Sequence, residues 1–209
     1  MNGFVNGLLD EQPYSLTVNG RNLASVMMLS GNEREFAVGY LTTEGITPFS
    51  EIESVMLDSN TISVLTVNPM KVLLPKKAVI SGCGGTASYL ESSRMPKITN
   101  PAVYQFENPE LNNEIVRAGG YSAVLITCEG AADLISDINQ TAAVNKAVGL
   151  ALYKKIPLEE CVLGVSGKVT ADIVRMCRFA QISKIVSLLP PTALAKSVAD
   201  DGGVKILTA

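Results

Sequence analysis

The chain has 209 residues, of which 47% are apolar and only 18% charged, and its formal net charge is −3. Soluble domains usually carry about 25% charged residues, so we expect part of this surface to lie in a subunit contact or a broad cleft. The sequence has no tryptophan and no basic cluster, which argues against a nucleic-acid-binding protein. It also has no apolar run near the ~18 residues of a membrane helix and no signal-peptide pattern, so we expect a cytoplasmic protein without a membrane segment.

The chain has four cysteines and no histidine. The cysteines form no C-x-x-C pair, so neither a zinc ribbon nor a secreted disulfide framework is well supported. Without histidine there can be no Ser-His or Cys-His catalytic pair and no imidazole metal ligand, and we expect no metal site. Cys128, Cys161 and Cys177 lie in apolar stretches, which indicates small core residues.

The first third of the chain indicates a small α+β domain. Asn19-Gly20 separates two runs of alternating apolar residues, which is a strong signal for a β-hairpin. Asn32 suits the cap of a helix that ends at Gly45, because Asn is favoured before the first turn and Gly after the last. The expected elements of this domain, residues 1–75, are the hairpin 11–29, the helix 32–45 and the strands 54–57 and 61–67.

A glycine-rich loop around Cys83 is the strongest candidate for chemistry. The apolar run 77–80 predicts a buried strand, and residues 87–91 predict the first turns of a helix. The loop Ser81-Gly82-Cys83-Gly84-Gly85-Thr86 would then hold a thiol where backbone N–H groups and a helix N-terminus stabilise a thiolate. The alternative is a free cysteine in an ordinary turn.

The remainder of the chain predicts an α/β domain over residues 76–209. Segment 92–114 is rich in proline and asparagine and indicates a connection with a short strand at 103–106. The last fifty residues alternate strand and helix, which implies parallel strands with right-handed crossovers. The expected elements are strands 122–127, 133–137, 162–166, 184–189 and 204–207, with helices 141–154, 170–181 and 192–201.

Four short segments with polar or glycine residues could line a ligand site. Ligands of open α/β sheets bind beyond the carboxyl ends of the strands, where Ser166-Gly167-Lys168 and Thr192 are expected. An anion there could meet helix-start N–H groups and a lysine, although the spacing does not match a P-loop, and a tight turn with a solvated lysine is the alternative. Gly119-Gly120 could let a ligand approach the backbone, but the alternative is an ordinary turn. Lys146 could also belong to the site, but the alternative is a solvated residue on a helix face.

Taken together, these segments resemble the FdhD/NarQ family, the formate dehydrogenase accessory sulfurtransferases, over nearly the full length. The resembling segments keep the family's order. They are Glu11-Gln12-Pro13, Val18-Asn19-Gly20, residues 35–46 (EFAVGYLTTEGI), Ser81-Gly82-Cys83-Gly84-Gly85, Gly119-Gly120 with Ala123, residues 143–149 (AVNKAVG), Ser166-Gly167-Lys168 and residues 191–195 (PTALA).

The resemblance implies a small N-terminal α+β unit followed by a cytidine-deaminase-like three-layer α/β unit with a mixed sheet, usually as a homodimer. It implies that Cys83 accepts sulfur from a cysteine desulfurase as a persulfide and passes it to the molybdenum cofactor of formate dehydrogenase. The phosphates of that cofactor's bis-guanine dinucleotide form, or of a free guanine nucleotide, would be bound at a pocket. The implied pocket residues are Gly119, Gly120, Lys146, Ser166, Gly167, Lys168 and Thr192.

Several motifs depart from the family pattern. Thr86 stands where the C-G-x-C-G loop has its second cysteine, and Ser122 stands where G-G-x-H has its histidine. The family segment G-R-H-N-A-V-D-K appears here as residues 139–146, NQTAAVNK, and the chain ends soon after its last strand. These departures favour altered or lost activity, so a non-catalytic module that binds a guanine nucleotide or a molybdoenzyme is the alternative. A deaminase would need a Cys/His zinc site, which the sequence lacks.

Overall fold

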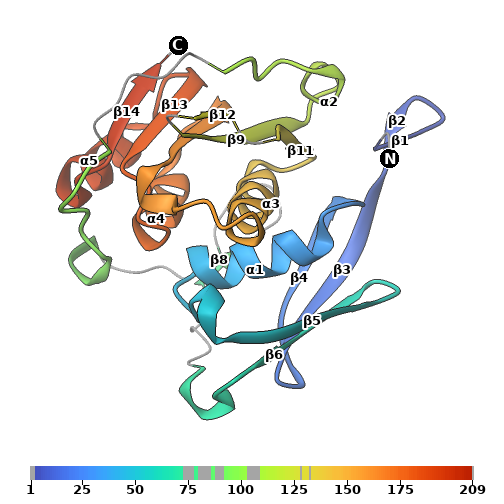
Figure 1. Cartoon of the computed structure of the whole chain (residues 1–209). Helices are drawn as coiled ribbons and strands as arrows, with labels where there is room; N and C mark the ends of the chain where they lie inside the picture. The colour runs from blue at the N-terminus through green and yellow to red at the C-terminus, as the bar shows by residue number, and fades with distance from the viewer. Residues whose placement is uncertain are drawn as a thin grey trace.

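A computed structural model of the chain describes residues 3–72, 78–79, 86–87, 92–102, 109–127, 129–131 and 133–208. Its elements are stacked in layers (Figure 1). The C-terminal sheet is followed by helices α3 (Gln140–Tyr153) and α4 (Ala171–Phe179), then by helix α1 (Glu33–Thr43), and finally by the N-terminal sheet. The structure is therefore a mixed α+β fold in which helices join two sheets.

The N-terminal sheet has the strand order β4-β3-β6-β5. Strands β3 and β4 form the predicted hairpin, and Asn19 and Gly20 at its turn have φ angles of 49° and 76°. Two left-handed residues in succession are what a two-residue turn between twisted strands requires. Strands β5 and β6 form the second predicted pair, and β6 lies parallel to β3. The strand bounds are β3 Glu11–Val18, β4 Arg21–Leu29, β5 Ile52–Asp58 and β6 Thr61–Thr66, with a small leading hairpin of β1 Phe4–Val5 and β2 Leu8–Leu9.

Helix α1 covers one face of this sheet. Its Phe36 and Leu41 pack with Leu16 and Ile62 of the sheet in one buried cluster, which also includes Ala142 of α3. Asn32 precedes the helix as predicted, but it has a φ of 60° and its side chain makes no capping hydrogen bond. The N-terminal core therefore depends on packing more than on this cap.

The second sheet has the path β10-β9-β12-β13-β14, with β11 also paired to β9. Strands β12, β13 and β14 are parallel, as predicted, and β9 is antiparallel to β12. The short strands β10 and β11 pair antiparallel with β9 and confirm the predicted return of the chain. The bounds are β9 Tyr121–Thr127, β10 Gly130–Ala131, β11 Ile135–Asp137, β12 Val162–Lys168, β13 Lys184–Leu189 and β14 Lys205–Thr208.

The two faces of the second sheet are covered differently. Helices α3, α4 and α5 (Ala193–Gly202) cover one face and share the largest buried cluster with it. On the opposite face Leu111 packs on Val124 and Val162. The remaining short elements are the one-turn helix α2 Glu114–Arg117, the 3-10 turns Phe49–Glu51, Pro69–Lys71, Ser92–Arg94 and Leu158–Glu160, and the paired strands β7 Ala78–Val79 and β8 Thr86–Ala87.

Two predicted local structures were wrong. Ala87 lies in strand β8, which pairs antiparallel with β7, so the expected helix does not begin there. Ser166-Gly167-Lys168 is the end of strand β12 and not a turn before the next helix. The predicted boundary between residues 75 and 76 and the predicted strand 103–106 lie outside the described residues, and buried clusters are found on both sides of that boundary.

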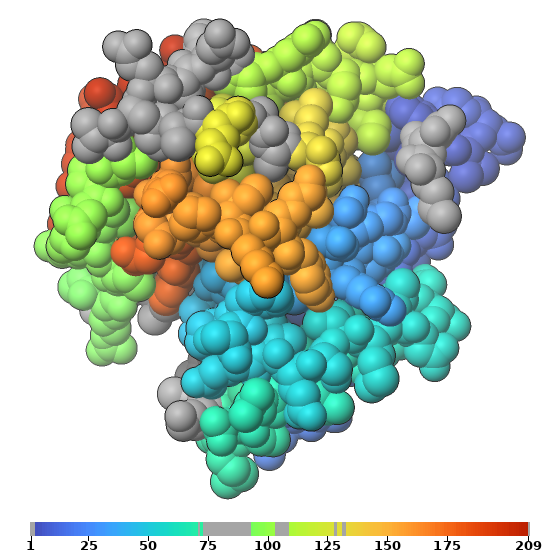
Figure 2. Space-filling view, in the orientation of Figure 1, coloured from blue at the N-terminus to red at the C-terminus, as the bar shows by residue number. Residues whose placement is uncertain are grey.

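The two halves of the molecule meet where α1 crosses α3. A Cβ atom added at Gly39 of α1 would overlap the carbonyl of Asn145, and one added at Gly149 of α3 would overlap the carbonyl of Glu35. Neither glycine has a positive φ, so backbone proximity and not backbone conformation requires glycine at both places. In the space-filling view the end of α3, in orange, lies against the blue and cyan N-terminal half (Figure 2).

Gly149→Ala should lower the free energy of unfolding by about 3 kcal/mol or more. Alanine in a helix interior normally stabilises by about 1 kcal/mol over glycine, but here the added methyl group would overlap backbone atoms that cannot rotate away. Urea unfolding followed by circular dichroism measures the change. Ser197→Ala on the exposed side of α5 is the control and should be neutral or slightly stabilising; an equally mild effect of Gly149→Ala would contradict the close crossing.

Candidate functional site

Several of the predicted ligand residues, Ser166, Lys168 and Thr192 among them, lie at one edge of the C-terminal sheet. Because β9 runs antiparallel to β12, its first residues lie beside the last residues of β12. The backbone N–H of Ser122 donates to the Ser166 hydroxyl at 2.8 Å. The backbone N–H of Thr192 donates to the carbonyl of Val169 at 3.0 Å, which brings the start of α5 to the same edge.

The first residue of α3 completes this edge. The Gln140 side-chain amide donates from Nε2 to the carbonyl of Lys168 at 3.0 Å. We call the edge formed by Ser166–Lys168, Gln140 and Thr192 the rim. A β-bulge lies within it, because the pairing of β12 with β13 shifts register between Val165 and Lys168. Bulges of this kind are frequent next to functional sites.

The rim lies at the N-termini of three helices. Thr192 caps α5 through a hydrogen bond from the N–H of Ala195, and Asn139 caps α3 through one from the N–H of Ala142. Neither helix has an acidic residue in its first turn. Helix α4 begins after Thr170 at the same edge, close behind β12. Helix N-termini carry partial positive charge, so this edge favours an anionic group.

The predicted pocket residues differ in how far they face solvent. Lys168 and Gly119 are exposed and Thr192 is half-buried, so these three can meet a ligand directly. The other four are buried within the protein. Gly120 lies against Ile115 and the carbonyl of Asp137, where a Cβ atom has no room. The buried members of the set are Gly120, Lys146, Ser166 and Gly167.

Lys146 forms a buried ion pair and is not a solvated residue of the helix face. Its Nζ lies 2.7 Å from Oδ2 of Asp137 and donates to the carbonyl of Leu29 at 2.6 Å. Only 1% of Lys146 and none of Asp137 is exposed. Burial raises the pKa of the Asp137 carboxyl, and the Lys146 ammonium opposes part of that rise. In this arrangement Lys146 positions β11, α3 and β4; its contact with a ligand stays a prediction.

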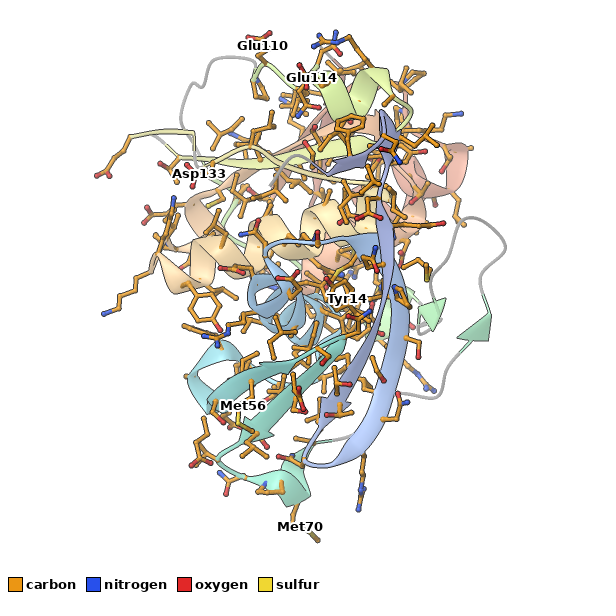
Figure 3. The ribbon with its side chains drawn as sticks, turned by 90° about the vertical axis from the view of Figure 1, so that its right-hand side faces the viewer. Tyr14, Met56, Met70, Glu110, Glu114 and Asp133 are labelled. Carbon is orange, nitrogen blue, oxygen red and sulfur yellow. The ribbon has the colours of Figure 1, made fainter. Side chains whose placement is uncertain are left out.

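A second pair of polar residues lies next to this ion pair. The Tyr14 hydroxyl donates to Glu33 at 3.0 Å, and burial together with that carboxylate raises the pKa of Tyr14 to about 12. Although burial alone would raise it, the pKa of Glu33 is lowered because the Gly31 amide, Tyr14 and Lys146 stabilise its charge. Tyr14 points into the junction between the N-terminal sheet and the helices (Figure 3). Sequence reasoning missed this group, because its members lie far apart in the chain.

A cluster of hydroxyl groups lies next to the rim, and Ser122 connects the two. The hydroxyls of Ser122 and Ser136 lie 2.7 Å apart, and the Asn113 amide donates to both, at 3.1 and 2.6 Å. Ser122, which stands where the family motif has histidine, thus belongs to a satisfied buried network. It offers no general base of the imidazole kind.

The chemistry of the described cysteines agrees with their interpretation as core residues. Cys161 and Cys177 are free and buried. Burial raises the pKa of the Cys161 thiol to about 12 and raises that of Cys177 as well, so neither is a thiolate at neutral pH. Cys83 and Cys128 lie outside the described residues. Cys83 follows β7 and precedes β8 in sequence, and Val79 pairs with Thr86 across these strands.

Metal and membrane sites find no support in the described part of the chain. Among these residues no three Cys, Asp or Glu side chains are grouped as metal ligands would be. None of the described helices has the length and apolar character needed to cross a bilayer.

A two-core α+β protein with a polar, helix-lined rim is the structural class that these observations define. The FdhD/NarQ family matches residues 9–209 of the sequence. The chain is 30% identical to the sulfur carrier protein FdhD of Sulfolobus acidocaldarius, over 94% of this chain and 83% of the relative. It is 29% identical to the sulfur carrier protein FdhD of Wolinella succinogenes, over 96% and 76%. The chain belongs to the FdhD/NarQ family.

A solved structure supports the same fold. The crystal structure of a protein described as a formate dehydrogenase accessory protein, from Desulfotalea psychrophila, matches with a TM-score of 0.71 at 20% sequence identity. The match covers 95% of this chain and 82% of that one. The predicted arrangement of helices and mixed sheets is thereby confirmed at the level of the fold.

Lys146→Met should lower the free energy of unfolding by about 3–5 kcal/mol, because Asp137 would be left as a buried charge without its partner. Lys154→Met is a matched control at the end of the same helix. Lys154 pairs with Asp133 at 2.8 Å, but these side chains are 43% and 71% exposed, so its removal should cost less than about 1 kcal/mol. Urea unfolding measures both; equal losses would show that the buried pair does not have this role.

The loss in Lys146→Met should depend on pH. Because burial holds the folded-state pKa of Asp137 above its ordinary value, the variant is most stable below that ordinary value, near ~4. Its stability then falls as pH rises through the raised folded-state pKa, where Asp137 must ionise without a cation. Unfolding curves between pH 4 and ~7 should therefore show the difference from the wild type growing with pH. A difference that is constant or shrinks with pH would contradict the assignment.

Proposed function

We propose that this chain accepts sulfur from a cysteine desulfurase as a persulfide on Cys83 and delivers it to the molybdenum cofactor of a formate dehydrogenase. The support that carries the proposal is family membership over residues 9–209. The relatives are named sulfur carrier proteins, and the structural neighbour is described as a formate dehydrogenase accessory protein. A cytoplasmic homodimer is part of the same proposal.

The first chemical step needs only one thiolate on this chain. The Cys83 thiolate attacks the outer sulfur of the desulfurase persulfide, a new S–S bond forms, and the donor cysteine leaves as a thiolate. One S–S bond forms as one S–S bond breaks, so there is no net oxidation. The rate of this exchange depends on the fraction of Cys83 present as thiolate and on the access of the donor to it. No general base of the histidine type is required for this exchange.

The rim is proposed to receive the guanine dinucleotide part of the cofactor substrate. Lys168, Thr192 and Gly119 would meet the phosphates directly, where the starts of α3 and α5, which have no acidic residue in the first turn, add positive potential. Gly120, Lys146 and Ser166 would act by holding these residues in place.

A second candidate function follows from Thr86. This residue lies in β8, opposite Val79, where the family loop has its second cysteine. A persulfide on Cys83 could not be resolved by a neighbouring loop thiol. The alternative is therefore a non-catalytic module that binds a guanine nucleotide or a molybdoenzyme with the same rim.

Incubation with a cysteine desulfurase and labelled cysteine tests the sulfur-transfer function. We expect Cys83 to gain one sulfur atom, detected by peptide mass spectrometry, and Cys83→Ala to lose the label. Cys161→Ala, which removes a buried thiol of raised pKa, is the control and should keep it. Label that persists in Cys83→Ala overturns the carrier role, and saturable GDP binding in calorimetry without labelling would select the non-catalytic alternative.

A further inference from the structure

Gly167 is buried although it lies next to the exposed Lys168 at the end of β12. The atoms nearest to a Cβ built on Gly167 belong to two side chains, those of Gln140 and Tyr121. A Cβ atom at Gly167 would overlap Oε1 of Gln140 and would lie 2.7 Å from the ring of Tyr121. The space that a ligand would need in order to approach the backbone of Gly167 is thus filled from within the protein.

We propose that Gln140 controls access to the strand end at Gly167, so that a phosphate-bearing nucleotide reaches this part of the rim only after the Gln140 side chain moves away. This inference rests on the proposed nucleotide-binding function and assigns a specificity-determining residue to it. Gln140 therefore sets the affinity of the rim for its ligand.

The bulge explains why a ligand would bind at the backbone of Gly167. Neither Ser166 nor Gly167 has a register partner in β13, and the pairing of β12 with β9 ends at Val165. The residues of a bulge are left out of the regular ladder. Gly167 therefore lies where the regular strand pairing is interrupted, and its backbone is the part of the strand end that a ligand would approach.

Gln140 can move more easily than Tyr121. Gln140 is half-buried at the first position of α3, and its amide donates one hydrogen bond, to the carbonyl of Lys168. Tyr121 belongs to β9 and pairs in register with Asp137 of β11. Loss of one such hydrogen bond changes an equilibrium by about fivefold. Displacing the Gln140 side chain therefore lowers the affinity for a ligand by a small but measurable factor.

Calorimetric titration of the full chain with GDP tests the role of Gln140. We expect Gln140→Ala to bind GDP about fivefold more tightly than the wild type, because nothing has to be displaced. Gln181→Ala is the matched control: its amide also donates to a backbone carbonyl, that of Arg178 at 2.8 Å, at the end of α4. It should bind GDP as the wild type does. Equal or weaker binding by Gln140→Ala overturns the inference.

A double-mutant cycle tests the contact without any ligand. Gly167→Ala should reduce stability toward urea in the wild type and reduce it less in the Gln140→Ala background, where one overlapping side chain is gone. Strictly additive losses would contradict the contact. If no form binds GDP, the proposed nucleotide function fails together with the access role, whereas equal binding by wild type and Gln140→Ala removes only the role of Gln140.

Discussion

The contact between α1 and α3 determines how the rest of the molecule is arranged. Because glycines at positions 39 and 149 let the two helix backbones touch, α1 lies against α3 at this crossing without an intervening layer of side chains. This approach brings the polar residues of α3 within reach of the N-terminal half. Asn145 accepts a hydrogen bond from Thr43 at 2.7 Å, and Lys146 reaches the carbonyl of Leu29. Larger residues at the crossing would separate these partners.

Buried charges make the same junction specific. Nη2 of Arg175 on α4 lies 2.6 Å from Glu44, just beyond α1, and 2.7 Å from Asp172. Buried ion pairs contribute little net stability compared with apolar packing, but breaking one is costly. The two pairs, Arg175–Glu44 and Lys146–Asp137, therefore act mainly against misplaced docking of the two halves. Sliding or rotation of either helix would separate a buried charge from its partner.

Local patterns in the sequence were enough to predict most elements, and they failed where distant residues decide the outcome. Asn19-Gly20 predicts its hairpin because the turn depends on the two residues themselves. The alternating last fifty residues predict parallel strands because crossovers have a fixed hand. By contrast, Lys146 looks like a surface lysine until Leu29, 117 residues earlier, is placed beside it. Likewise, nothing local in the sequence indicates that the side chains of Gln140 and Tyr121 lie against Gly167. What the sequence did not reveal was which distant residues of the chain contact these positions.

Two of the positions that depart from the family motifs, Gln140 and Thr141, have the same physical setting. Gln140 and Thr141 lie at the start of α3 and are half-buried, so their side chains can change without leaving a cavity or an unpaired charge. Further along the helix the side chains are buried. There Asn145 accepts a hydrogen bond from Thr43, and Lys146 pairs with Asp137. A change there would cost stability before it altered binding. Ala142 and Asn145, which are buried, also depart from the family segment, so departures occur on both the half-buried and the buried part of this helix. The chain thus keeps the architecture of its family, with a TM-score of 0.71 to a solved structure, although several residues of this segment differ from the family pattern.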